Sequence, residues 1–512
     1  MGIVLVVLGL SVRQPGVCQA FHPGGPGSAR WVKSIGERKN GAVTRIGILG
    51  GGPAGYEAAL VAAQLGAEVT VVERDGLGGA CVLFDCVPSK TFIATSETMS
   101  VFRTAPLRGV QPAERDGPVV DPPSVYSRVK DLARAQSGDV RTRLLAEGVR
   151  VTAGSVRFAA DQGTNRATHR LEITTTPGAA ADLLDVDVVL IATGATPRVL
   201  ADARPDGERI LTWRQVYDLP RLPEHLVVIG SGVTGAEFAS AYTEMGVPVT
   251  LVSSRDRVLP TEDADAAAVV EHVFTAHGGT LVKHARATAV RRTEKGVLVE
   301  LASGGSIESS HALMTVGSVP NTAGIGLENV GVPVGSGGFV TVDRVSRTAV
   351  PGIYAAGDCT GVLMLASVAA MQGRIAMWHA LGEAVTPLRL KTVAATVFTS
   401  PEIATVGIQE KAIVDGVVPA RTVRLDLATN PRAKMQGLRE GFVKLFCRPA
   451  TGVIIGGVVV APAASELILP VTLAVQNQLT VAQVASTFSV YPSLSGSLTE
   501  AARQLMVHDD LD

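Results

Sequence analysis

Two cysteines, Cys81 and Cys86, stand with four residues between them in the segment GGACVLFDCVPSK, which spans residues 78–90. Thiols at this spacing can cycle between a dithiol and a disulfide, and the reacting species is the thiolate. The pair therefore predicts a redox centre. It raises the question of what the protein reduces and whether this disulfide takes part.

Two other segments of the chain predict binding sites for dinucleotides. Residues 44–73 (TRIGILGGGPAGYEAALVAAQLGAEVTVVE) and 225–254 (HLVVIGSGVTGAEFASAYTEMGVPVTLVSS) each indicate a strand, a glycine turn, a helix and a second strand. In each turn the first glycine allows the tight bend, the second lets backbone amides approach a pyrophosphate, and the third lets the helix pack closely on the strand. These glycines are Gly50, Gly52 and Gly55 in the first segment and Gly230, Gly232 and Gly235 in the second.

The two segments end in different residues, which predicts different nucleotides. Glu73 stands 18 residues beyond Gly55, where a carboxylate can accept hydrogen bonds from both hydroxyls of an unphosphorylated adenosine ribose. The matching place in the second segment holds Ser253, followed by Ser254 and Arg255. Without the carboxylate a 2′-phosphate is not repelled, so the second site is expected to accept NADPH and NADH. The alternative is that the basic residues there simply face solvent.

The composition indicates a large α/β protein. A chain of 512 residues exceeds the size of a single hydrophobic core, so two to four domains are expected. A net charge of -1 gives no electrostatic signature for nucleic acid or for an anionic membrane. Aromatic residues make up only 4% of the chain, which favours close packing of helices on sheets.

The remaining cysteines and the N-terminal segment bear on location. Cys18, Cys359 and Cys447 have no close partner in the sequence, so a disulfide scaffold is not expected and a reducing, cytoplasmic location is. Residues 1–43 begin with a short apolar run that has no basic residue before Ile3 and is too short to span a membrane. We expect a disordered extension or a start site assigned too far upstream, and no integral membrane segment.

Six motifs in order give a family resemblance. The first glycine turn is followed by the cysteine pair, DVVLIATG (187–194), the second glycine turn, GIYAAGDC (352–359) and FTSPEIATVG (398–407). Together they resemble the class I pyridine nucleotide-disulfide oxidoreductases. The resemblance implies FAD in the first nucleotide site, NAD(P)H in the second and a C-terminal domain that forms a homodimer.

The resemblance also implies a fold class: α/β, with two Rossmann-like dinucleotide-binding domains plus a C-terminal α+β dimerisation domain. It places a discontinuous FAD-binding domain at 44–195 and 320–385. An NAD(P)-binding domain is then expected at 196–319, and the dimerisation domain at 390–512.

The family pattern assigns further residues to the site. Asp358 matches the residue that hydrogen-bonds the ribityl chain of FAD. Lys90 and Glu237 match a buried pair at the flavin that can hold charge as hydride arrives, the alternative being an ordinary ion pair. The residues expected to bind the two cofactors are Gly50, Gly52, Pro53, Ala54, Gly55, Glu73, Lys90, Thr193, Gly194, Gly230, Gly232, Gly235, Glu237, Ser253, Ser254, Arg255, Gly317, Gly357 and Asp358. No metal site is expected.

The C-terminal segment departs from the family pattern. A disulfide reductase of this family takes a base from the partner subunit, in a motif that reads His-Pro-x-x-x-Glu. The segment FSVYPSLSGSLTEAARQL has Tyr491 at the histidine position and Gly496 at the glutamate position. Tyr491 can donate a hydrogen bond, but its ordinary pKa near 10 makes it a weak base; the alternative role is packing at the dimer interface. The chain has no histidine between His379 and His508.

Three further segments sharpen the expected function. YPSLSG, together with SHALMTVGSVPNT (310–322) and LASVAAMQGRIAM (365–377), resembles the flavoprotein NAD(P)H-quinone reductase branch of the family. A quinone can take electrons directly from flavin, so it requires no interchange thiol. The expected function is therefore FAD-dependent transfer of hydride from NAD(P)H to a quinone, with Cys81, Cys86, Lys90, Glu237 and Tyr491 as candidate catalytic residues.

Other functions stay open at this point. The intact pair Cys81 and Cys86 is compatible with dihydrolipoyl dehydrogenase or another disulfide reductase. A flavin-mediated NAD(P) transhydrogenase is a further alternative. A flavin-binding scaffold with negligible turnover would need neither Lys90 nor Glu237.

Overall fold

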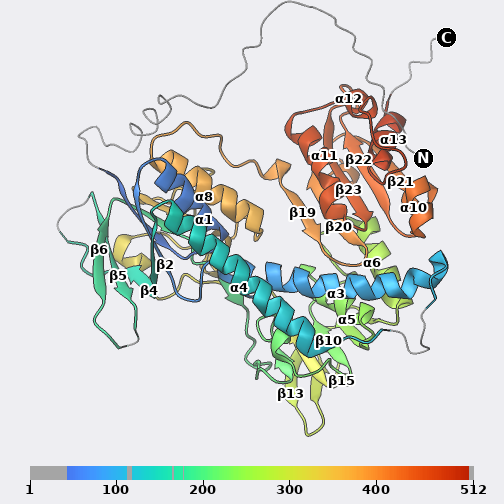
Figure 1. The fold of residues 1–512 in the computed structure, drawn as a ribbon, viewed down its shortest axis with the longest axis horizontal. Helices are drawn as coiled ribbons and strands as arrows, with labels where there is room; N and C mark the ends of the chain where they lie inside the picture. Colours follow the sequence, from blue (N-terminus) through green and yellow to red (C-terminus); the bar gives the residue numbers. More distant parts are fainter. Residues whose placement is uncertain (1–42, 112–117, 164–166, 177, 507–512) are drawn as a thin grey trace, which may run out of the picture.

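The computed structural model describes residues 43–111, 118–163, 167–176 and 178–506. Figure 1 shows three sheet-based parts joined by long helices. The expected N-terminal extension lies outside the described residues apart from residue 43, and so does His508. None of the described helices combines the length and apolar character needed to cross a bilayer.

The first part contains a five-stranded parallel sheet in the order β18-β7-β1-β2-β3. Its strands are β1 (Arg45–Leu49), β2 (Glu68–Glu73), β3 (Arg150–Ala153), β7 (Val188–Ile191) and β18 (Ile353–Ala355). The central strands are apolar runs because both faces of the sheet are covered, one by helices and the other by an antiparallel sheet that contributes Phe158 and Leu171. β18 pairs with β7 although it follows the whole second part in sequence.

Small residues pack the helices of this part. Helix α1 (Pro53–Gln64) lies against α8 (Ala366–Ala380) over the sheet (Figure 1). A Cβ atom on Gly373 would lie 2.2 Å from the carbonyl oxygen of Ala54, so the two helices approach too closely for any side chain there. The low aromatic content of the chain follows from this type of contact.

Further elements extend the first part. They are α2 (Gly79–Leu83), α3 (Cys86–Thr104), α4 (Pro122–Ala146), α7 (Leu327–Val330), η6 (Asp358–Thr360) and an antiparallel sheet of β4 (Ser155–Phe158), β5 (His169–Thr174) and β6 (Asp182–Val186). The short helix η4 (Val216–Asp218), which belongs to the second part, contacts α4. Helices α3 and α4 pack together and run from the first part toward the second (Figure 1). Helix α3 also packs on α5 of the second part, which makes it the main bridge between them.

The second part repeats the parallel arrangement, with strand order β12-β11-β10-β16-β9. Its elements are β9 (Ile210–Leu211), β10 (Leu226–Ile229), α5 (Val233–Glu244), β11 (Val249–Val252), α6 (Ala264–Ala276), β12 (Thr280–Val282), β13 (Ala287–Arg292), β14 (Val297–Leu301), β15 (Ser306–Ser309) and β16 (His311–Met314). The chain enters and leaves this part through β8 (Ala195–Pro197) and β17 (Ser318–Pro320), which pair antiparallel. The domain limits given above remain predictions.

The third part is an antiparallel sheet in the order β19-β20-β23-β22-β21, covered by helices. Its elements are β19 (Ala394–Val397), β20 (Glu402–Gly407), α9 (Glu410–Val414), β21 (Arg421–Asp426), α10 (Pro431–Gln436), β22 (Phe442–Cys447), β23 (Ile454–Ala461), α11 (Ala464–Gln476), α12 (Val481–Ala485) and α13 (Gly496–Gln504). With two parallel sheets before it, this arrangement confirms the predicted fold class.

A buried lysine fastens the third part to the second. The side chain of Lys444 on β22 is 1% exposed. Its Nζ lies 2.9 Å from a carboxylate oxygen of Asp263 and 3.0 Å from one of Asp265, both at the start of α6. Glu410 of the third part lies 2.7 Å from the same Nζ. One ammonium group therefore neutralises carboxylates from both parts.

Removing this ammonium group is expected to destabilise the protein strongly. Lys444→Met leaves three clustered carboxylates without their shared cation, so the free energy of unfolding should fall by about 3–5 kcal/mol in urea denaturation. Lys411→Met is the matched control, because Lys411 pairs with Asp415 on the surface and its loss should change stability by less than about 1 kcal/mol. Equal losses of stability in the two variants would contradict the claim that Lys444 stabilises the contact between the second and third parts.

Candidate active site

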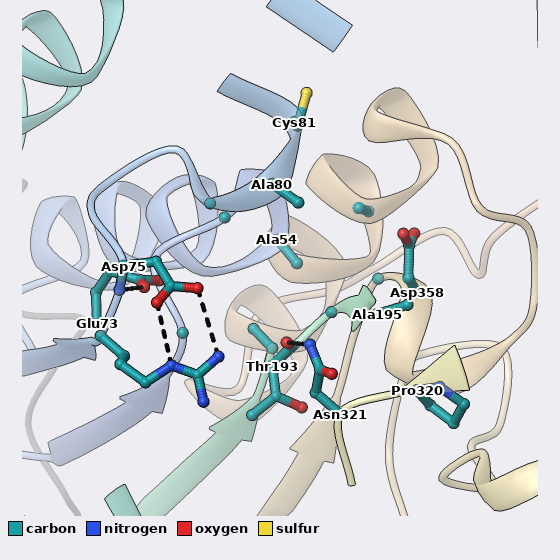
Figure 2. Close-up of a pocket in the computed structure, with 18 of the residues that line it drawn as sticks. Ala54, Glu73, Asp75, Ala80, Cys81, Thr193, Ala195, Pro320, Asn321 and Asp358 are labelled. Carbon is teal, nitrogen blue, oxygen red and sulfur yellow. Dashed lines mark hydrogen bonds and ion pairs between the residues drawn. The ribbon is translucent and has the colours of Figure 1, made fainter. Parts of the chain in front are cut away.

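A cavity of about 560 Å³ opens at the carboxyl ends of β1 and β7. From β1 the chain continues to β2, which pairs with one edge of β1, whereas β7 pairs with the opposite edge. The strand order therefore reverses between β1 and β7. Such a topological switch point is where open α/β sheets bind their ligands. Figure 2 shows the lining side chains, with Glu73 and Asp358 on opposite sides of the view. The volume is within the usual range for small-molecule sites.

The first glycine turn forms one wall of this cavity. Gly50 has a φ angle of +105°, and a Cβ there would lie 2.3 Å from the carbonyl oxygen of Ala192. A Cβ on Gly55 would lie 1.9 Å from the carbonyl oxygen of Gly50, so helix and strand touch through bare backbone. Gly52 precedes α1 without any side-chain cap, which leaves amide groups at the helix start for an anion.

The carboxylate of Glu73 is held at the end of β2. It accepts hydrogen bonds from the amides of Gly51, at 2.6 Å, and Asp75, at 2.7 Å. Asp75 in turn pairs with Arg74 and Arg214. Glu73 lines the cavity (Figure 2), so its position is compatible with ribose binding, which stays a prediction.

The second glycine turn has the same backbone form but a different neighbour. A Cβ on Gly235 would again lie 1.9 Å from the carbonyl oxygen of the first glycine, Gly230. At the end of β11 the Ser253 hydroxyl is fully buried and lies 2.7 Å from the hydroxyl of Ser231. Its role in nucleotide binding stays a prediction, but its hydrogen-bonding capacity is already used within the protein.

The accessible side chains at this position are the next two. Ser254 and Arg255 are exposed, whereas Arg257 donates hydrogen bonds to the carbonyl groups of Pro260 and Glu262. Ser254 and Arg255 are therefore more accessible to a 2′-phosphate than Ser253 or Arg257.

Lys90 and Glu237 form the expected ion pair. Lys90 Nζ lies 2.9 Å from one carboxylate oxygen of Glu237, whose side chain is 5% exposed. The other oxygen accepts a hydrogen bond from the amide of Phe398 at 2.9 Å. Burial lowers the pKa of Lys90, but the charge and hydrogen bond of Glu237 outweigh it and hold that pKa above its usual value. Both charges are therefore fixed in place.

The two cysteines line the cavity close to this pair. Cys81 belongs to α2 and Cys86 begins α3, and both thiols are free. The hydrogen bond from Cys86 holds the pKa of Cys81 below its usual value. The same hydrogen bond, burial and the charge of Asp85 raise the pKa of Cys86. The structure thus brings the predicted thiols together in one pocket.

Asp85, which the motif comparison passed over, is the neighbour that distinguishes this pair. Burial raises the pKa of its carboxyl to about 6, opposed by Lys90 and aided by Glu237 and Asp358. It stands at the N-terminal end of α3 but does not cap the helix. The helix dipole favours the ionised form of Asp85 by only about 0.3–1 kcal/mol. A pKa shift of one unit corresponds to about 1.4 kcal/mol, so the dipole is too weak to cancel the effect of burial. An acid directly before the second cysteine was the signal available in the sequence.

Several predicted residues share the cavity wall, and others lie elsewhere. The predicted residues that line it are Gly50, Gly52, Pro53, Ala54, Glu73, Cys81, Cys86, Thr193, Gly194, Gly357 and Asp358. Asp358 makes no side-chain cap at η6, so its carboxylate remains available to a ligand, and burial raises its pKa. Gly317 has a φ angle of +92° beside β17, at the crossing between the first two parts.

Tyr491 is not brought to the cavity within one chain. Its side chain is 81% exposed, in the segment between α12 and α13. Phe488 and Val490 in the same segment are exposed too. Its contribution to catalysis stays a prediction that depends on a second chain.

The cavity fits a dinucleotide with a flavin end. One end offers bare amides of a glycine turn and the carboxylate of Glu73, which suit a pyrophosphate and a ribose. The other end holds Asp358 and the thiols, beside Lys90 and Glu237. These donor and acceptor groups are the types that FAD requires.

Comparisons with known proteins agree with this geometry. Residues 44–373 match the family model described as pyridine nucleotide-disulphide oxidoreductase, and 393–502 match its dimerisation domain. The chain is 62% identical over 473 residues to a Mycobacterium tuberculosis protein named NAD(P)H dehydrogenase (quinone), covering 92% of this chain and 95% of that protein. It is 32% identical over 461 residues to a dihydrolipoyl dehydrogenase from Chlorobaculum tepidum, covering 89% and 96%.

A solved structure gives the same answer for the fold. The crystal structure of LpdA from Mycobacterium tuberculosis is similar with a TM-score of 0.87 and 61% identity, over 91% of this chain and 100% of that one. The motifs, the two nucleotide turns and these matches lead to one assignment. The chain belongs to the pyridine nucleotide-disulphide oxidoreductase family.

Proposed function

We propose that this chain is an FAD-dependent NAD(P)H:quinone oxidoreductase. Its family consists of oxidoreductases that use FAD and NAD(P)H. The relative at 62% identity is named for quinone reduction, whereas the dihydrolipoyl dehydrogenase is half as similar. The observation that carries the proposal is an intact Lys90–Glu237 pair beside thiols on which the carboxyl group of Asp85 acts.

The first nucleotide turn is the proposed FAD site. Gly50 and Gly52 would face the pyrophosphate, Glu73 the adenosine ribose and Asp358 the ribityl chain. When bound, FAD supplies acceptance of a hydride and release of its electrons singly or in pairs. The second turn, Gly230 with Gly232, would hold NAD(P)H, with Ser254 and Arg255 near the ribose.

The Lys90–Glu237 pair is proposed to stabilise charge during hydride arrival. Its ammonium group is held 2.9 Å from the carboxylate and does not need to reorient as negative charge develops nearby. Such preorganised charge is worth more in a site that excludes water. The amide of Phe398 keeps the carboxylate in place, so the third part of the fold supports the hydride site.

The thiols are poorly equipped for the alternative reaction. Disulfide interchange requires a thiolate and a base that moves protons. The family pattern supplies a histidine as this base, and this chain has Tyr491 at that position. The hydrogen bond with Cys81, burial and the charge of Asp85 raise the pKa of Cys86, whereas the hydrogen bond from Cys86 lowers the pKa of Cys81. A quinone avoids this requirement because its oxygens can take protons from any nearby acid or from water.

Disulfide reduction is the second candidate, because both thiols are free and line the same cavity. Loss of a positioned base typically lowers the rate by about 10²- to 10⁴-fold, so this activity should be slow. A cytoplasmic location is part of the proposal, consistent with reduced thiols.

A homodimer is also proposed. The matched dimerisation domain and the exposed apolar side chains of Phe488, Val490 and Tyr491 support it, since such a cluster is normally covered by another surface. The native mass in solution should be about twice 53.0 kDa by light scattering. A stable monomer with full activity would contradict a role for Tyr491 in a partner's site.

The ion pair gives a test of the hydride half-reaction. Glu237→Gln keeps the shape of the side chain and one hydrogen-bond acceptor, replaces the second acceptor by a donor, and removes the negative charge that fixes Lys90. Bleaching of the flavin absorbance by NADPH in a stopped-flow experiment should slow by about 10²-fold. Glu244→Gln is the matched control, because Glu244 lies on the same helix as Glu237 and also forms an ion pair, with Arg103. It should leave the bleaching rate within about 2-fold of wild type. Equal slowing in both variants would indicate a general effect on α5.

The choice of acceptor tests the function itself. FAD-loaded protein is assayed with NADPH and with NADH, using a soluble naphthoquinone or lipoamide as the acceptor. Because the disulfide base is absent, kcat/KM for the quinone should exceed that for lipoamide by at least about 10²-fold. Faster turnover of lipoamide would refute the proposed function and favour dihydrolipoyl dehydrogenase.

A further inference from the structure

One carboxyl group in the cavity has no part in the reaction as described so far. Asp85 lies between the two cysteines in sequence and lines the same cavity, with its side chain only partly exposed. Aspartate is among the best residues for capping a helix, yet Asp85 stands at the start of the 19-residue helix α3 and its side chain does not cap it. Its carboxyl is therefore available to whatever enters the cavity.

The charges around Asp85 do not balance. The charged groups that act on it are Lys90 on α3, Glu237 on α5 and Asp358 on η6. Only one of them, Lys90, is a cation, and its ammonium group is already bound to Glu237. Asp85 in turn acts on Cys81 of α2, Cys86 of α3 and Tyr217 of η4. Glu237 accepts hydrogen bonds from both Lys90 and the Phe398 amide. A partly buried carboxyl that has no cation of its own keeps its proton to a higher pH than usual.

We propose that Asp85 is the proton donor to the quinone, an inference that rests on the proposed function. Reduction of a quinone by NAD(P)H consumes a hydride and one further proton, and yields NAD(P)⁺ and a hydroquinone. The quinone receives the electron pair together with the hydrogen of the hydride, which forms one O–H bond of the hydroquinone. The O–H bond of the Asp85 carboxyl breaks, and its proton forms the second O–H bond on the other quinone oxygen. The Asp85 carboxylate then takes up one proton from solvent, which is the proton consumed in the overall reaction.

The position of Asp85 explains how quinone reduction can proceed without the family base. A donor must lie within hydrogen-bond reach of the reacting oxygen, and Asp85 belongs to the wall of the cavity in which the thiols lie. A donor is most effective when its pKa is near the working pH, and burial raises the pKa of Asp85 to about 6. Asparagine at this position would keep the size but could not donate an acidic proton.

The substitution Asp85→Asn in the FAD-loaded enzyme tests this role. We expect kcat/KM for a soluble naphthoquinone to fall by about 10²-fold at pH 6. The wild-type value should decline as pH rises through about 6, because only the protonated carboxyl donates, and the variant should show a flat profile over that range. Asp85→Glu, which retains an acid, should recover much of the rate and the pH dependence.

Three comparisons separate proton donation from a structural effect. Ferricyanide takes one electron and no proton, so its reduction by Asp85→Asn should stay within about 2-fold of wild type. Bleaching of the flavin by NADPH should also be unchanged. Glu97→Gln, on the exposed side of the same helix, is the control substitution and should alter none of these rates.

Thermal unfolding gives a readout that does not depend on turnover. The folded carboxyl holds its proton to about pH 6, whereas an aspartic acid in the unfolded chain loses it near its ordinary pKa of 3.8. Wild-type stability should therefore fall relative to Asp85→Asn as pH rises from about 4 to about 6, and the difference should persist above pH 6.

The possible failures are distinguishable. Quinone reduction by Asp85→Asn at the wild-type rate, with the same pH profile, would overturn the proton-donor role and leave the proposed function intact. An equal loss with ferricyanide and naphthoquinone would also overturn it, because the defect would then lie in electron transfer. Wild-type enzyme that reduces lipoamide but not quinones would refute the proposed function, and this inference with it.

Discussion

A single carboxylate connects the three parts of this protein. One oxygen of Glu237, on α5 of the second part, binds Lys90 of α3, and the other accepts from the amide of Phe398 in the third part. A buried ion pair contributes little net stability, but losing one partner leaves an uncompensated charge. The pair therefore acts mainly as a geometric constraint, which fixes α3 and its cysteine end relative to both nucleotide turns.

The constraint also sets the charge balance of the cavity. Lys90 is bound to Glu237, so its charge opposes but does not cancel the effect of burial, which raises the pKa of Asp85. Burial likewise raises the pKa of Asp358. Once Asp85 ionises above about pH 6, its charge opposes thiolate formation at the neighbouring cysteines. The same arrangement thus supports hydride arrival and disfavours disulfide exchange. It leaves the cavity suited to an acceptor that takes electrons and protons directly, as a quinone does.

Much of the fold could be predicted because its signals are local. The tight turn of a nucleotide-binding segment needs a positive φ angle, such as the +105° of Gly50, which glycine adopts most readily. The two nucleotide turns could therefore be predicted from the glycine pattern alone. The raised pKa of Asp85 could not, because it depends first on burial and then on the charges of Glu237 and Asp358, which only the fold brings near. Likewise, the sequence predicted that Ser253 would contact the nucleotide, but in the fold its hydroxyl is hydrogen-bonded to the hydroxyl of Ser231. Tyr491 needs a second chain before its surroundings can be described.

The central claim is that electrons reach the acceptor without passing through the cysteine pair. In a double-mixing stopped-flow experiment, FAD-loaded protein is first reduced with one equivalent of NADPH and then mixed with a soluble naphthoquinone. Wild type and Cys81→Ser should return electrons to the quinone at rates within about 2-fold, since a quinone requires no interchange thiol. A fall of tenfold or more in Cys81→Ser would show that the thiols carry the electrons and would contradict the claim.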